Sequence, residues 1–199
     1  MKKITLLFIL TIACSQLGVF ADSSYSVQPY PTPPGIVCEV TGVDYSEDGT
    51  LYICTRRGDV WAQKNGDWKR FAYGLHEPMG LLAGPSFAIV SQRPELTRLV
   101  DEDEDGTADR YETICDQIAM EANFHQYNYG LVKGKIAGNL YGILSCSGLS
   151  KPDGSPASAN GFSPIPYRMW SYQITPSGEF RPWSSGLRTA NGIGKSPQG

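Results

Sequence analysis

The sequence predicts an all-β fold of the β-propeller class, with about three blades in 199 residues. Short apolar runs alternate with turns rich in Gly, Asp and Asn, which is typical of successive antiparallel strands. Groups of four such runs recur along the chain, and four short strands in succession are the unit of a propeller blade. A β-sandwich with coincidental turns is the alternative.

The first group of four strands is expected soon after a Pro-rich segment at 30–34. Asp48-Gly49 separates the first two runs, and this dipeptide is a strong signal for a tight hairpin. The four expected strands are Gly42–Tyr45, Leu51–Cys54, Val60–Ala62 and Trp68–Tyr73.

The same pattern returns further along the chain. Phe71–Leu75 followed by Gly80 matches Trp183–Leu187 followed by Gly192, with the same spacing between the glycines. Blades are therefore expected to start near Gly42, Gly80, Gly130 and Gly192, with Ala88–Val90 in the second and Gly138–Ile143 in the third. Ser147–Pro166 reads as an inserted surface loop, and Asn191–Gly199 as the beginning of a further blade, which indicates part of a larger propeller.

The N-terminus has the pattern of a secretory signal peptide. Lys2 and Lys3 precede the apolar run Ile4–Ile12, and Val19-Phe20-Ala21 is a cleavage signal. We therefore expect a signal peptide at 1–21 and a partial propeller domain at 22–199, working in the periplasm or secreted. A lipoprotein anchored at Cys14 is the alternative. No later run is long enough for a transmembrane helix.

After removal of the expected signal peptide the chain is acidic and retains four cysteines. Removing residues 1–21 takes away two lysines and no acidic residue, which shifts the formal net charge from −3 to −5. The remaining basic residues are scattered, so a nucleic-acid partner is not expected. Cys38, Cys54, Cys115 and Cys146 allow two disulfides in three pairings that the sequence does not separate, and Cys54 reads equally well as a buried apolar residue.

An acidic loop at Asp101–Glu112 carries the strongest motif, D-x-D-x-D-G-x5-E. Alternate oxygen ligands of a tight loop can converge on a hard cation such as Ca²⁺, and Gly106 permits the sharp turn. A solvated acidic turn is the alternative. The flanking residues suit a helix or a strand, and the surrounding chain favours strands. The expected ligands are Asp101, Asp103, Asp105, Thr107 through its carbonyl, Asp109 and Glu112.

Four other residues are candidates for ligand binding, and one for catalysis. His125, just before the Gly130 strand, has a pKa range suited to a general base, or is a hydrogen-bonded loop histidine. His76 and Asn191 lie in loops between blades, or simply form turns. Arg56 and Arg57 follow a strand and suit a carboxylate or quinone oxygen, or belong to a solvated hairpin turn.

Several segments resemble one family of bacterial propellers. The segments Cys54–Trp61, Gly74–Leu81, Gln92–Leu99, Trp170–Phe180 and Ser185–Gly194 look like the N-terminal part of the membrane-bound-dehydrogenase type, related to glucose/sorbosone dehydrogenases. This resemblance implies a six-bladed extracytoplasmic propeller, pyrroloquinoline quinone (PQQ) with calcium, a sugar or polyol substrate, and His125 as the base. It also implies a c-type cytochrome domain encoded downstream as a possible electron acceptor.

Two function classes follow from these observations. One is a quinone-dependent dehydrogenase of a sugar or polyol with a structural calcium site. The other is a non-catalytic, calcium-stabilised propeller that binds carbohydrate or a protein.

Overall fold

The computed structural model describes residues 26–120, 126–145, 165–187 and 190–196. The chain divides into two units, Met1–Pro31 and Thr32–Gly199. The described residues of the first unit, 26–31, contain neither helix nor strand. All the regular structure of the second unit is β in the part of the chain that is described.

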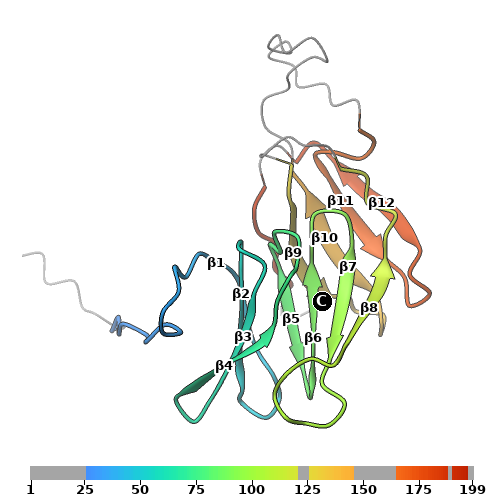
Figure 1. Ribbon diagram of the computed structural model, residues 1–199. Coiled ribbons are helices and arrows are strands. Elements are labelled where there is room, and N and C mark those ends of the chain that lie inside the picture. Colours follow the sequence, from blue (N-terminus) through green and yellow to red (C-terminus); the bar gives the residue numbers. More distant parts are fainter. Residues whose placement is uncertain (1–25, 121–125, 146–164, 188–189, 197–199) are drawn as a thin grey trace, which may run out of the picture. The chain divides into compact units, whose positions relative to one another are not determined.

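Twelve strands form three separate four-stranded sheets in this described part (Figure 1). Every sheet is an antiparallel meander in which consecutive strands pair. Blade 1 contains β1 (Val40–Tyr45), β2 (Leu51–Thr55), β3 (Val60–Lys64) and β4 (Asp67–Ala72). Blade 2 contains β5 (Leu81–Gly84), β6 (Phe87–Ser91), β7 (Leu96–Val100) and β8 (Arg110–Cys115). Blade 3 contains β9 (Asn128–Lys133), β10 (Leu140–Leu144), β11 (Trp170–Ile174) and β12 (Phe180–Ser185).

These sheets confirm the predicted propeller fold. The four strands expected in blade 1 are present within two residues of their predicted bounds. The acidic loop connects β7 to β8, so it lies in a β-hairpin and not between helices. The first strand of the further blade expected within Asn191–Gly199 is not formed in the described residues 190–196. Most of the predicted insertion at 147–166 lies outside the described residues.

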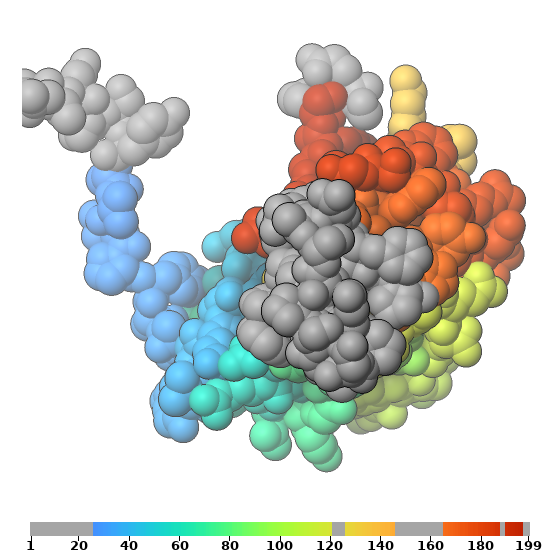
Figure 2. Space-filling model, turned by 90° about the horizontal axis from the view of Figure 1, so that it is seen from above, coloured from blue at the N-terminus to red at the C-terminus, as the bar shows by residue number. Residues whose placement is uncertain are grey.

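The three blades pack face to face through two apolar cores. The first core joins blade 1 to blade 2 and includes Val60, Phe71 and Leu99. The second joins blade 2 to blade 3 and includes Leu96 and Tyr172. Blade 2 therefore packs against a neighbour on both faces, which explains why its inner strands β5 and β6 are almost continuously apolar. Figure 2 shows the three blades following one another in chain order.

Glycines let the first strands of neighbouring blades approach closely, and strands β1, β5 and β9 contact one another in turn. A Cβ atom on Gly42 would lie 3.1 Å from the carbonyl carbon of Gly80. A Cβ on Gly80 would lie 2.5 Å from the carbonyl oxygen of Gly130, and one on Gly130 would lie 2.3 Å from Cγ2 of Ile193. Three of the four glycines that mark the predicted blade starts, Gly42, Gly80 and Gly130, thus lie at close contacts, whereas a Cβ on Gly192 would meet no atom within 4 Å.

The repeated Gly-Leu segment forms the same turn at the end of two blades. Gly74 and Gly186 have φ values of 76° and 88°, a backbone conformation that glycine adopts without steric cost. The amide of Leu75 donates to the carbonyl of Gly58 at 3.1 Å, and the amide of Leu187 donates to that of Met169 at 2.9 Å. The sequence repeat therefore reflects a structural repeat.

The described part of the chain contains three cysteines and no membrane-spanning helix. Cys38, Cys54 and Cys115 are free, and Cys146 lies outside the described part. Cys54 and Cys115 pack in different apolar cores, in agreement with the alternative that Cys54 is a small buried apolar residue. No helix in the described chain is long and apolar enough to cross a bilayer.

Because neighbouring strands are antiparallel, the connections alternate between two ends of the blades. The β2–β3 turn, the β4–β5 connection and the β6–β7 turn share one end, which we name the arginine end after Arg56, Arg57 and Arg93. The β1–β2 turn and the β7–β8 loop share the opposite end, which we name the acidic end after the loop at 101–109.

The glycine contacts predict the effect of one methyl group. Gly80→Ala places a Cβ within 2.6 Å of two backbone atoms of Gly130, which cannot move without shifting blade 3. We expect the free energy of unfolding, measured by urea denaturation, to fall by about 1–3 kcal/mol. Gly194→Ala is the control, because a Cβ there meets no atom within 4 Å. Equal stability of the two variants would contradict the close contact.

Candidate functional site

The arginine end carries a chain of ion pairs that links residues from two blades. The guanidinium of Arg56 lies 3.3 Å from Glu39, just before β1, and 3.2 Å from Glu77 in the β4–β5 connection. Arg57 approaches Glu39 at 3.5 Å. Arg93, in the β6–β7 turn, contacts the other carboxylate oxygen of Glu77: its Nε lies 3.0 Å from that oxygen.

Burial distinguishes these arginines. The side chain of Arg93 is only 6% exposed, whereas those of Arg56 and Arg57 are 45% and 58% exposed. Glu39, followed by a hydrogen bond with the Tyr127 side chain, raises the pKa of Arg56 above its usual value. Three guanidinium groups face two carboxylates, so this cluster has an excess of positive charge.

Tyr127, which directly precedes β9 of blade 3, also contacts this cluster of arginines and glutamates. The guanidinium of Arg93 lies over its ring, 4.8 Å from the centroid, which is a cation–π arrangement. The buried Arg168, just before β11, donates to the carbonyl of Tyr127 at 3.4 Å and to that of Ala119 at 2.5 Å. Residues of all three blades therefore converge at the arginine end.

The other predicted ligand-binding residues occupy different surroundings. His76 is exposed and lies in the β4–β5 connection beside Glu77; its amide donates to the side-chain oxygen of Gln92. Its carbonyl accepts from the amide of Arg93 at 3.1 Å. Asn191 is exposed in a segment without strand structure. His125 lies outside the described residues, although Gln126 that follows it is fully buried.

Sequence reasoning missed Glu39, Glu77, Arg93, Tyr127 and Arg168. Each is an ordinary residue in its local segment, and its partners are distant in the sequence. One local signal was present, because Glu77 precedes a proline and Gly74–Leu81 recurs in the chain. Glu77 has φ of 44°, a left-handed conformation that is uncommon for a residue with a side chain.

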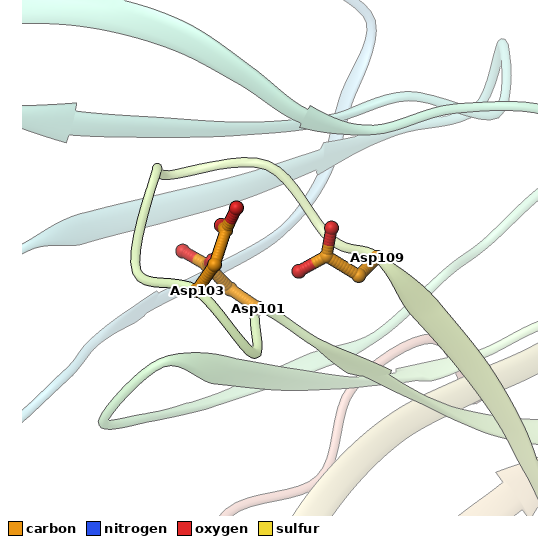
Figure 3. Close-up of side chains that lie close together, drawn as sticks. All are labelled: Asp101, Asp103 and Asp109. Carbon is orange, nitrogen blue, oxygen red and sulfur yellow. The ribbon is translucent and has the colours of Figure 1, made fainter.

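The acidic loop brings three of the predicted metal ligands together. Carboxylate oxygens of Asp101, Asp103 and Asp109 lie within 4.8 Å of one another (Figure 3). Asp101 is only 7% exposed, and its two oxygens accept from the amides of Asp105 and Gly106 at 3.1 and 2.8 Å. Asp109 reaches across the loop and accepts from the amide of Glu102 at 2.8 Å. This donor set suits a hard cation.

The remaining predicted ligands have partners within the protein. The side chain of Asp105 accepts from the amide of Thr107 at 2.7 Å and pairs with Lys69 at 3.4 Å. A hydrogen bond from the Thr107 side chain is the main cause that lowers the pKa of Asp105. Glu112 lies on β8 and pairs with Arg110. Asp105 and Glu112 are therefore in ion pairs of their own, outside the cluster of three aspartates.

Several contacts join the acidic loop and its following strand to blade 1. The amide of Ala108 donates to the carbonyl of Phe71 at 2.7 Å. The hydroxyl of Tyr111 accepts from the amide of Tyr73 at 3.1 Å and donates to its carbonyl at 3.2 Å. Lys69 on β4 also donates to the carbonyl of Asp105. The loop therefore holds two blades together at their outer strands.

The ion pairs predict unequal effects of two matched substitutions. Glu77→Gln removes the carboxylate charge from the buried Arg93, and we expect the free energy of unfolding to fall by about 2 kcal/mol. Glu179→Gln breaks a fully exposed pair with Arg181, and we expect a smaller loss because solvent screens that pair. Urea denaturation measures both. A larger loss for Glu179→Gln would contradict a stabilising role of the Glu77 pair.

Comparisons with known proteins show the fold and leave the family open. No protein-family model matches the chain, and no curated protein matches its sequence. The proposed oxidoreductase (glucose dehydrogenase) of Thermus thermophilus has a TM-score of 0.52 at 18% identity, over 71% of this chain and 46% of that one. The holo PQQ domain of pyranose dehydrogenase from Coprinopsis cinerea has a TM-score of 0.51 at 13% identity, over 70% and 34%.

A third solved structure, a family AA12 carbohydrate-active enzyme of Trichoderma reesei, has a TM-score of 0.50 at 10% identity, covering 70% of this chain and 36% of that one. The chain spans less than half the length of each of these three structures. The likeness shows a β-propeller fold, and the described chain contributes three blades of it.

Proposed function

We propose that this chain belongs to an extracytoplasmic β-propeller dehydrogenase that oxidises a sugar or polyol with a bound quinone. The observation that carries the proposal is the arginine end, where residues of three blades bring an excess of positive charge together. The fold shared with the PQQ domain of a pyranose dehydrogenase supports the same class of reaction.

The side chains at the arginine end fit PQQ, which carries carboxylates and quinone oxygens. Arg57 is the most exposed guanidinium of the three and has the longest ion pair, 3.5 Å, so it is the group most available to a ligand carboxylate. Arg56 presents a planar, permanently charged donor beside it. When bound, the quinone supplies a two-electron acceptor for the substrate hydride.

The protein contributes a base and a fixed orientation. In this proposal His125 accepts the proton of the substrate hydroxyl, while the hydride leaves the carbon atom that bears this hydroxyl. The chain that follows His125 reaches the arginine end, since Tyr127 stacks with Arg93 and Asn128 donates to the carbonyl of Gln92 at 3.0 Å. His76 and Asn191 are assigned to substrate binding at the same end.

The acidic loop is proposed to hold a structural Ca²⁺ through Asp101, Asp103 and Asp109. Three carboxylates this close repel one another, and a divalent cation removes that repulsion. Because the loop bonds to Phe71 and Lys69 of blade 1, an ion there stiffens the junction of two blades. The other three predicted ligands complete the shell in this proposal. Asp105 must then separate from Lys69 and Glu112 from Arg110, while Thr107 contributes its carbonyl.

A second function is favoured by one specific observation. Arg56 and Arg93 are already engaged by Glu77, so the arginine end resembles a finished structural network as well as a ligand site. In that case the propeller binds a carbohydrate or a protein without chemistry, and calcium serves stability alone.

Enzyme activity is tested on the full-length protein purified without cofactor. Addition of PQQ and Ca²⁺ should permit dye reduction with at least one member of a panel of sugars and polyols. His125→Ala should lower kcat by about 10²–10⁴-fold because the base is lost. Lys135→Ala, an exposed change in the β9–β10 turn, is the control. No reduction by the loaded protein would exclude the dehydrogenase and leave the binding propeller.

The calcium site is tested by titration calorimetry and melting temperature. Asp101→Asn and Asp109→Asn should each weaken Ca²⁺ binding and remove the rise in Tm that Ca²⁺ produces, because each takes a carboxylate from the cluster. Asp116→Asn, an exposed acid just beyond β8, should bind like the wild type. Equal calcium affinity in all three variants would contradict this site.

A further inference from the structure

Glu39 places one carboxylate oxygen between two of the arginines at the arginine end. Its Oε2 lies 3.3 Å from Nη2 of Arg56 and 3.5 Å from Nε of Arg57. Its Oε1 accepts from Nη2 of Arg56 at 3.4 Å. Two guanidinium groups therefore converge on one oxygen position, which is how arginines present themselves to a bound carboxylate.

These contacts of Glu39 are loose. Hydrogen bonds between a guanidinium and a carboxylate have N–O distances of about 2.7–2.9 Å when they are well formed, and all three contacts of Glu39 are longer. The Oε2 atom is buried, yet it makes no hydrogen bond with any described residue. An oxygen removed from water without a hydrogen bond is unfavourable. The carboxylate of Glu39 is therefore held in this place mainly by charge.

The second carboxylate of the cluster, Glu77, is held more firmly. Its Oε2 lies 3.0 Å from the buried Arg93, whose guanidinium in turn lies over the ring of Tyr127. Its Oε1 lies 3.2 Å from Nη1 of Arg56. Moving Glu77 would take the carboxylate away from a buried cation, which is strongly unfavourable. Glu77 therefore stays in place when a ligand binds.

Glu39 is free to leave, because its own partners are exposed to solvent. Its side chain is 34% exposed, and those of Arg56 and Arg57 are still more exposed. Solvent compensates all three charges when the pairs separate, and exposed ion pairs of this kind contribute little to stability.

The backbone keeps Glu39 within reach of the arginines after its side chain has moved. The amide of Arg56 donates to the carbonyl of Glu39 at 3.0 Å, immediately before β1 pairs with β2. Only the side chain of Glu39 has to rotate, and no strand has to separate. Glu39 is thus a tethered carboxylate that can leave the two guanidinium groups and return to them.

We propose that Glu39 is an internal competitor, which occupies a carboxylate subsite formed by Arg56 and Arg57 until an anionic ligand displaces it. An oxygen of the ligand carboxylate takes the position of Glu39 Oε2 and pairs with both guanidinium groups. Arg56 keeps Glu77 on its Nη1 and offers its Nη2 to the ligand. This inference rests on the proposed function, in which the ligand carboxylate belongs to the quinone.

The competitor determines which ligands enter the subsite. A neutral sugar brings no charge to replace that of Glu39, so it would leave Arg56 and Arg57 with less compensation than before. A ligand carboxylate restores the compensation, and it can do so at the shorter distances of a well-formed pair. The subsite therefore admits a planar carboxylate and rejects neutral molecules.

The experiment is calorimetric titration of the full-length protein with PQQ and with benzene-1,2,4-tricarboxylate, a planar anion without redox chemistry. Glu39→Gln should bind both anions about three- to fivefold more tightly than the wild type, because an exposed ion pair competes only weakly. Arg57→Gln should bind both about tenfold more weakly, since one of the two guanidinium groups is lost. Glu47→Gln is the matched control, because it removes the same charge from an exposed residue of the β1–β2 turn at the acidic end. Circular dichroism verifies that each variant is folded.

Tighter binding by Glu39→Gln, with Glu47→Gln like the wild type, supports the competitor, because a damaged site does not gain affinity. Equal affinity of Glu39→Gln and Glu47→Gln overturns it. Weaker binding by Glu39→Gln also overturns it, because Glu39 then orders the arginines instead of competing with the ligand. Absence of binding of both anions to the wild type and to Glu39→Gln overturns the subsite itself.

The dye-reduction assay separates this inference from the proposed function. Tighter binding of the tricarboxylate by Glu39→Gln without any dye reduction keeps the competitor and removes the quinone-dependent dehydrogenase. Dye reduction by the loaded wild type, together with unchanged anion affinity in Glu39→Gln, keeps the dehydrogenase and removes the competitor.

Discussion

Close backbone contact between the first strands of neighbouring blades is the constraint on which this structure depends. A Cβ atom on Gly42 would lie only 3.1 Å from the carbonyl carbon of Gly80, and one on Gly80 would lie 2.5 Å from the carbonyl oxygen of Gly130, where there is no room for it. The contacts of β1 with β5 and of β5 with β9 follow from this approach, and they bring the apolar faces of the sheets within packing distance. Glycine is required here because a side chain would clash with the backbone of the neighbouring blade, and not because the backbone makes a turn.

The arrangement of the blades separates two chemistries. Antiparallel strands send alternate connections to opposite ends, so Arg56 and Arg93 gather at one end while Asp101 and its neighbours gather at the other. The arginine end suits an anionic cofactor, and the acidic end suits cations. We propose that the first serves catalysis and that the second serves stability.

Much of the fold was predictable because its signals are local. The Asp48-Gly49 hairpin, the recurring glycines and the clear strand boundaries of blade 1 depend on short segments. The acidic loop was recognisable for the same reason, and three of its six predicted ligands cluster. The further blade expected to begin within Asn191–Gly199 shows no strand in the described residues 190–196, where Ile193 packs on Gly130.

The network at the arginine end was not predictable from the sequence. Glu39 and Glu77 are far from their arginine partners in the chain, and only blade packing brings them together. Long-range ion pairs and clefts depend on register and approach, and local residue types do not encode these.

Anomalous diffraction from crystals of the full-length protein grown with Ca²⁺ tests the central claim most directly. The account predicts a peak enclosed by Asp101, Asp103 and Asp109, at the end of the blades remote from Arg56. A peak among the residues of the arginine end with an ordered but empty acidic loop would contradict the division of the propeller into a catalytic end and a cation-binding end.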